Sequence, residues 1–112
     1  MRHMVMDARV EALRSELTVW AARQPGLRRL WIYGSRALGT HRPDSDLDVA
    51  FEIGRLEDQA AIEEFHDRTL PAWRTELSRL SGLSAHLEAS VGDASNVARY
   101  VAGSGVLVYE RR

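Results

Sequence analysis

The sequence predicts an α/β (α+β) fold in which helices cover a small mixed β-sheet. Apolar residues recur at helical spacing in some segments and alternate with polar residues in others. The two kinds of segment follow one another in the order α-β-turn-β-α-(α)-β-α-β, which is typical of a sheet with helices packed against it. No repeat, low-complexity stretch or linker interrupts the 112 residues. We therefore expect a single domain over residues 1–112.

The first predicted element is an amphipathic helix over residues 7–23. Charged residues fill one face, and apolar residues recur at the spacing of the other face: Val10, Leu13, Leu17, Trp20 and Ala21. Asp7 has a side chain suited to a helix N-cap. Pro25 and Gly26 end the helix.

Two strands with a turn between them follow this helix. Residues 30–33 form a short apolar run rich in strand formers, which indicates a buried strand. Gly34 and Ser35 then turn the chain into about one helical turn, and a polar loop with Pro43 leads to residues 46–52. These residues alternate, so one face carries Leu47, Val49 and Phe51 and the other carries Asp46, Asp48, Ala50 and Glu52.

A helical region is expected from residue 56 to residue 81. Pro71 should kink or split it near Thr69 and Leu70, because proline lacks an N–H group and crowds the preceding turn. Gly82 closes the region. Its expected core contacts are Phe65, Trp73, Leu77 and Leu80.

The end of the chain returns to the strand pattern. Residues 84–90 alternate, with Ala85, Leu87 and Ala89 expected inward and His86 and Glu88 outward. A last helix is predicted over residues 94–102, and a final short strand over residues 106–110.

Composition narrows the class of protein. The chain is 45% hydrophobic and 28% charged, which is typical of a folded domain and not of a disordered one. Its net charge of −1 disfavours a general nucleic-acid binder. It has no cysteine, so only oxygen and imidazole groups can bind a metal. There is no signal-peptide pattern and no apolar run of the roughly 20 residues that span a membrane, so we expect a cytoplasmic location.

The candidate chemistry lies in residues 34–48, GSRALGTHRPDSDLD. Asp46 and Asp48 stand two positions apart on a predicted strand and so share a face. Two carboxylates at such a short distance repel each other unless a cation lies between them. Mg²⁺ prefers such oxygen ligands and keeps several water or phosphate ligands as well.

The same stretch contains features that suit a polyphosphate. A Gly34-Ser35 turn that begins a helix exposes N–H groups and a hydroxyl to a phosphate. Arg36 and Arg42 could balance the phosphate charge. A D-x-D pair alone is more often solvated surface charge, and the Gly-Ser turn at this distance favours a site instead. Together the parts suit metal-assisted nucleotidyl transfer with pyrophosphate as the leaving group.

The stretch GSRALGTHRPDSDLDVAF resembles the signature of the DNA polymerase β nucleotidyltransferase superfamily, which is G-S, ten residues, then D-x-D. The short length and the ending YVAGSGVLVYE resemble the minimal nucleotidyltransferases (MNT) of prokaryotes. The resemblance covers residues 27–110 and is specific over residues 34–51. It implies a polymerase β-like nucleotidyltransferase fold.

The resemblance also implies roles for individual residues. Asp46 and Asp48 would bind Mg²⁺, and Gly34 and Ser35 would hold the phosphates of the nucleotide. In the family, a third acid lies on a later strand. We expect this acid to be Glu88, which would face the cleft as a further metal ligand and catalytic residue.

Two other acids compete for the third position. Glu52 shares the face of Asp46 but lies roughly 13 Å farther along the strand from Asp48, and Asp93 is placed to cap the last predicted helix. Glu88 is flanked by apolar residues, as the third acid of the family is. Many relatives have Asp there, so the longer Glu departs from the family pattern.

MNT proteins often pair with a HEPN-domain RNase toxin and act as its antitoxin, and some transfer AMP from ATP to a tyrosine of the toxin. The resemblance therefore implies a Mg²⁺-dependent protein adenylyltransferase that uses ATP and has a HEPN partner. One alternative is an antitoxin that neutralises its toxin by binding alone. Another is a small-molecule nucleotidyltransferase, for which we would expect an extra helical domain. Nucleotide addition to RNA or DNA is disfavoured by the near-neutral charge.

Overall fold

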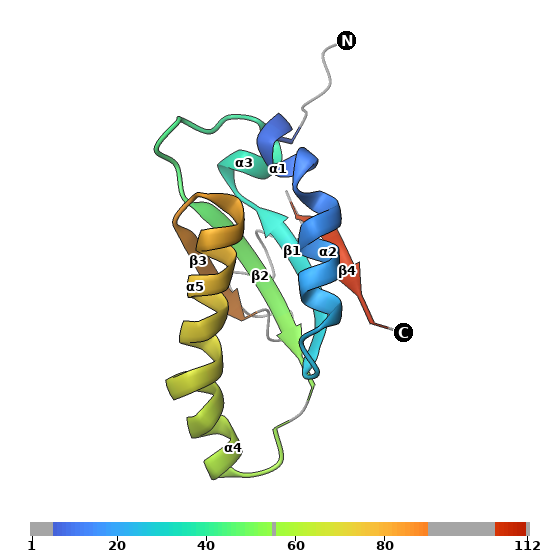
Figure 1. The fold of residues 1–112 in the computed structure, drawn as a ribbon, viewed down its shortest axis with the longest axis vertical. Helices are drawn as coiled ribbons and strands as arrows, with labels where there is room; N and C mark the ends of the chain where they lie inside the picture. Colours follow the sequence, from blue (N-terminus) through green and yellow to red (C-terminus); the bar gives the residue numbers. More distant parts are fainter. Residues whose placement is uncertain (1–5, 55, 90–104, 112) are drawn as a thin grey trace.

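The computed structural model describes residues 6–54, 56–89 and 105–111. Within them, four strands form one sheet in the order β3-β2-β1-β4 (Figure 1). β1 pairs antiparallel with β2 and β4, whereas β2 and β3 run parallel. The sheet is therefore mixed, as the sequence predicts. The strands are β1 (Leu27–Tyr33), β2 (Leu47–Ile53), β3 (Ala85–Ala89) and β4 (Val106–Glu110).

Helices α2 (Arg14–Ala22) and α5 (Leu70–Ser81) lie in front of the sheet in Figure 1. Apolar side chains of β1 and β2 face them, since the register pairs Leu30 with Phe51 and Ile32 with Val49. These strand residues and the inward faces of both helices belong to one buried cluster. Its aromatic centre is made of edge-to-face contacts among Trp20, Phe51, Phe65 and Trp73.

The predicted helix over residues 7–23 is two helices, α1 (Ala8–Ala12) and α2. Asp7 caps α1 as expected, because its carboxylate accepts a hydrogen bond of 3.0 Å from the Arg9 amide. The break lies at Leu13, whose N–H donates to the carbonyl of Val10, three residues back. This hydrogen bond spans three residues where an α-helix spans four, and it ends α1. Leu13 is the one residue between α1 and α2.

The second helical region begins later than predicted and passes through a π turn. α4 (Gln59–Glu64) starts after Asp58, whose carboxylate accepts a hydrogen bond of 2.8 Å from the Ala61 amide. The π-helical turn η1 (Phe65–Thr69) leads directly into α5 and ends just before Pro71. Pro71 cannot donate to the carbonyl four residues back, and a widened turn accommodates its ring without ending the helix.

The outer strands bear out most of the predicted pattern. In β3, Ala85 and Leu87 are buried and His86 and Glu88 face outward, but Ala89 is exposed where the sequence predicts it inward. Ala89 is the last residue of an edge strand. The predicted final strand is confirmed as β4. The helix predicted over residues 94–102 lies outside the described residues.

The remaining helix, α3 (Ser35–Leu38), is the single helical turn expected after β1. It leads into the loop that ends at β2. The turn after β1 and the start of β2, which carry the two parts of the predicted motif, therefore lie at the same end of the sheet (Figure 1). Over the ranges that the structure describes, no helix is long and apolar enough to cross a membrane.

Candidate active site

The two aspartates lie at the start of β2. Asp46 directly precedes the strand and is exposed, and Asp48 is its second residue and is half-buried. Leu47 and Val49 are fully buried on the helix-covered face. Side chains alternate along a strand, so Asp48 faces the other side of the sheet. The predicted strand is therefore confirmed from Leu47 onward, and Asp46 lies one residue before it.

The Gly34-Ser35 turn, the other part of the predicted motif, passes close to Asp48. It follows β1, whose last residue, Tyr33, pairs with Asp48 in the antiparallel register. The backbone of Gly34 has φ +75° and ψ −156°, a region that is essentially restricted to glycine. A Cβ atom on Gly34 would lie 2.4 Å from Oδ2 of Asp48. Only glycine allows this turn to pass so close to the carboxylate.

The electrostatics of Asp48 favour a nearby cation. Burial raises the pKa of Asp48 above its ordinary value, the charge of Asp46 raises it further, and His86 opposes the shift. The ionised pair is therefore costly without a positive partner. Two carboxylates that act on each other electrostatically fit the oxygen donors that Mg²⁺ takes, with water and phosphate as its other ligands.

Arg36 has a different place from the predicted phosphate contact. Its guanidinium is buried and pairs with the Asp7 carboxylate at 2.5 Å. It also donates to the Ser45 carbonyl, from Nη2 at 2.9 Å and from Nε at 3.0 Å. Longer hydrogen bonds reach the carbonyls of Arg42 and Pro43. Because these groups surround its N–H donors, Arg36 holds the loop before Asp46 and is not free for a nucleotide.

The sequence did not reveal that Asp7 is the ion-pair partner of Arg36. Only its capping role is visible locally, because the ion pair joins residues 29 positions apart. Burial alone would raise the pKa of Asp7, but hydrogen bonds from Arg36 and the Arg9 amide, with the charge of His41, lower it below its ordinary value. Nε2 of His41 lies 3.5 Å from the same carboxylate. The Asp7–Arg36 pair thus ties α1 to the loop that carries Asp46.

The loop itself is closed by a β-turn. The Ser45 amide donates to the carbonyl of Arg42 at 3.0 Å, and the Arg42 amide donates to the Ser45 hydroxyl at 2.8 Å. Pro43 and Asp44 occupy the centre, where proline fits the backbone angle of a type I turn. The side chain of Arg42 is exposed. Its predicted contact with a nucleotide stays a prediction, as does that of Ser35, the first residue of α3.

Glu88 lies on the same face of the sheet as Asp48 but is not opposite it. The parallel register pairs Glu88 with Ala50 and pairs His86 with Asp48. Oε1 of Glu88 lies 2.9 Å from Nε2 of His86. In the part of the chain that the structure describes, no three Asp, Glu or His side chains are grouped for a metal ion. The role of Glu88 as third metal ligand stays a prediction.

Glu52, another acid of β2, is held by an ion-pair network. Arg29 lies between Glu52, at 2.8 Å, and Glu110, at 2.6 Å, and so links three strands. These pairs are partly exposed and contribute little stability individually. They nevertheless give the Glu52 carboxylate a partner in Arg29. The rejection of Glu52 as third acid stays a prediction.

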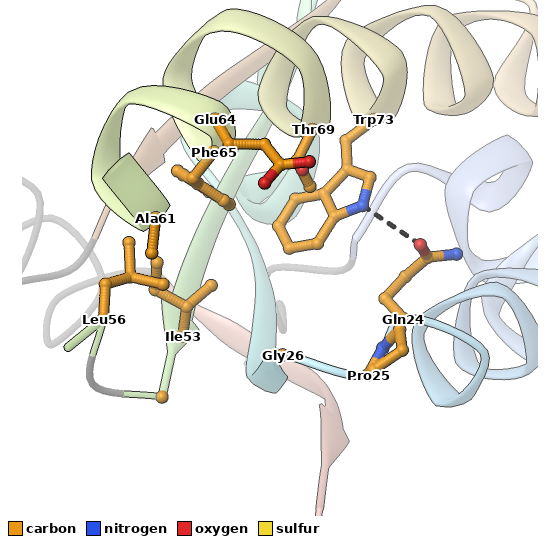
Figure 2. A pocket seen from close by; sticks show the side chains of 11 residues that line it. Gln24, Pro25, Gly26, Ile53, Leu56, Ala61, Glu64, Phe65, Thr69 and Trp73 are labelled. Atoms are coloured by element: carbon orange, nitrogen blue, oxygen red, sulfur yellow. Dashed lines mark hydrogen bonds between the residues drawn. The ribbon is translucent and has the colours of Figure 1, made fainter. Parts of the chain in front are cut away.

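A pocket of about 380 Å³ lies at the other end of β2 (Figure 2). Its walls are largely apolar and include Ile53, Phe65 and Trp73, and the indole N–H of Trp73 donates to the Gln24 amide oxygen at 3.0 Å. Ile53 is five residues beyond Asp48, roughly 16 Å along the strand. The pocket is therefore separate from the aspartate pair and contains none of the predicted site residues.

Comparison with known proteins agrees with this geometry. The family model of the nucleotidyltransferase domain matches residues 17–87. This match includes Gly34, Ser35 and both aspartates, and ends at the residue before Glu88. A search of curated proteins found no match.

Solved structures share the fold at low sequence identity. A toxin–antitoxin with AMP-PNP is 18% identical with a TM-score of 0.55, over 93% of this chain and 73% of that one. The toxin–antitoxin MntA-HepT is 14% identical with a TM-score of 0.54, over 90% and 73%. The tri-AMPylated Shewanella oneidensis HEPN toxin in complex with MNT antitoxin is 16% identical with a TM-score of 0.53, over 90% and 73%. The family match, the mixed sheet and the Gly34–Asp48 contact agree, and the chain belongs to the nucleotidyltransferase domain family.

Proposed function

We propose that the protein transfers AMP from ATP to a hydroxyl group of a partner protein. The observation that carries this proposal is the close approach of the Gly34 backbone to the Asp48 carboxylate, beside Asp46 at the start of β2. This approach brings together the turn suited to phosphate and the acids suited to a metal ion. Both parts are required for nucleotidyl transfer.

Each part of the site then has a chemical role. Asp46 and Asp48 would hold Mg²⁺, which neutralises charge on the phosphates when it is bound. The Ser35 hydroxyl and the amides of the turn would hold phosphate oxygens, and the exposed Arg42 would add positive charge. Arg36 and Asp7 keep the loop in place and so set the position of Asp46.

The reaction follows from this arrangement. The acceptor oxygen attacks the α-phosphorus of ATP, and a new P–O bond forms. The bond from that phosphorus to the bridging oxygen of the leaving pyrophosphate breaks, and the hydroxyl proton is released to water. Alignment of the acceptor with the leaving group is the main contribution of the protein to such a step.

We further propose that the acceptor is a tyrosine of a HEPN-type toxin, so that the protein acts as an antitoxin in the cytoplasm. The support is that similar solved structures are toxin–antitoxin complexes, one with AMP-PNP and one with an AMPylated HEPN toxin. The exposed side chains of Arg42 and Asp46 just before β2 also suit an acceptor brought by another protein.

The test uses ATP labelled either at the α-phosphate or at the γ-phosphate, with the purified toxin of the pair. We expect the toxin to gain the α label and not the γ label. Asp48→Asn should abolish labelling, whereas Asp44→Asn, an exposed aspartate in the same loop, should not. Neutralisation of the toxin without any label would contradict transfer and support the binding-only alternative.

A further inference from the structure

The strand register places an imidazole next to Asp48. β2 and β3 are parallel, with Asp48 paired to His86 and Ala50 paired to Glu88. Neighbouring strands lie about 4.8 Å apart, and Glu88 is two residues, or roughly 6.6 Å, farther along its strand. Asp48 and His86 therefore leave the same face of the sheet from adjacent positions. On β3, His86 is better placed than Glu88 to reach a cation held by Asp48.

Glu88 has a partner that explains its position. Its Oε1 lies 2.9 Å from Nε2 of His86, and both side chains are about half exposed, at 45% and 55%. An ionised carboxylate only accepts hydrogen bonds, so Nε2 of His86 carries the proton that is donated to Glu88. In the neutral ring, Nδ1 then has the free lone pair that a metal ion needs. Metal-binding histidines commonly have a carboxylate on their second nitrogen in this way.

The contact between His86 and Glu88 contributes little to the stability of the fold. An exposed ion pair of this kind contributes only about 0–1 kcal/mol to stability. The parallel register pairs His86 with Asp48 and so places the imidazole beside the carboxylate.

We propose that His86 supplies a nitrogen ligand to the metal ion held by Asp46 and Asp48, and that Glu88 is the residue that positions its imidazole. This inference rests on the proposed function. The described side chains are not grouped around one point, so binding requires rotation of the half-exposed His86 side chain toward Asp48. An imidazole ligand favours transition-metal ions relative to Mg²⁺. We therefore expect the site to select Mn²⁺ over Mg²⁺.

The test is pulsed electron paramagnetic resonance of the full chain with Mn²⁺ and inorganic triphosphate. Triphosphate occupies the place of the nucleotide but contains no nitrogen, so any directly bound nitrogen comes from the protein. We expect a nitrogen coupling in the wild type that is lost in His86→Ala and kept in His41→Ala. Circular dichroism and thermal unfolding establish that each variant is folded.

Two further variants separate a ligand from a neighbour. Glu88→Gln should keep the fold and weaken Mn²⁺ binding about 10- to 100-fold, as loss of an orienting group does. His86→Asp should give a site with oxygen ligands alone. Because the preference for Mn²⁺ is then lost, the ratio of the Mg²⁺ to the Mn²⁺ dissociation constant should fall. Equal Mn²⁺ affinity in Glu88→Gln and the wild type would overturn the role of Glu88.

The outcomes also separate this inference from the proposed function. Mn²⁺ that binds through Asp48 without nitrogen coupling overturns the role of His86 and leaves AMP transfer intact. Mn²⁺ binding that is unchanged in Asp48→Asn overturns the aspartate site itself. Nitrogen coupling in the wild type that disappears in His86→Ala supports the inference, whether or not an acceptor protein has been found.

Discussion

Gly34→Ala is the smallest change that tests the arrangement of the site. The native backbone at Gly34, with φ +75° and ψ −156°, costs a side-chain-bearing residue about 1–3 kcal/mol. The added methyl would also lie 2.4 Å from Oδ2 of Asp48, inside the 3.0 Å limit that real Cβ contacts respect. The Asp48 carboxylate must therefore move from its position beside the turn.

The expected loss of stability lowers the melting temperature by on the order of 5–15 °C for a domain of this size. Thermal unfolding measures this shift, and calorimetric titration with Mg²⁺ and a non-hydrolysable ATP analogue measures binding, which should weaken more than tenfold. Gly26→Ala is the matched control, because a Cβ atom there meets nothing within 4 Å and the backbone φ is not positive. Equal melting temperatures and equal affinities in the two variants would refute the reasoning.

Three other substitutions test the charged groups. In the absence of metal, Asp48→Asn should raise the melting temperature at neutral pH. The raised pKa of Asp48 means that the folded state favours the neutral carboxyl. The stability that this gives is present below the ordinary pKa of 3.8 and is lost as pH rises through the folded-state pKa, so the ionised Asp48 is destabilising at neutral pH. Unchanged stability at neutral pH would contradict this. Arg36→Leu should lower the free energy of unfolding by about 3–5 kcal/mol, because it leaves the buried Asp7 carboxylate without its partner, and denaturant titration against Arg42→Leu measures the difference. The lowered pKa of Asp7 contributes stability that is present above 3.8 and lost as pH falls through the folded-state pKa. Asp7→Asn should therefore be less stable at neutral pH but lose less stability on acidification, and parallel unfolding curves for the two proteins would argue against it.

Local patterns were enough to predict much of the fold. The alternation in residues 46–52 predicts the strand and the burial of Leu47, Val49 and Phe51, because the period of a strand is fixed by its geometry. Ala50, predicted on the opposite face, is buried as well. The strand predicted over residues 106–110 is observed as β4. The helix N-cap at Asp7 is also local, since it joins residues two positions apart. Features of this kind depend on neighbours in sequence, which the sequence displays directly.

Features that depend on distant partners were not predicted. Arg36 has the charge expected of a phosphate ligand, and only the fold shows that Asp7 and the Ser45 carbonyl occupy it. Similarly, the alternation over residues 84–90 places His86 and Glu88 on one face, but strand pairing decides which of them lies opposite Asp48. A register is a long-range property that no local spacing reveals.

The intact mass of the toxin after incubation with ATP and Mg²⁺ tests the central claim most directly. With the wild-type protein, we expect the toxin to gain the mass of AMP, and fragmentation should place the group on a tyrosine. Asp46→Asn and Asp48→Asn should give toxin of unchanged mass, while Asp44→Asn should act as the wild type does. A toxin that gains AMP equally with Asp48→Asn would contradict the account, because the carboxylate beside Gly34 would then have no part in the transfer.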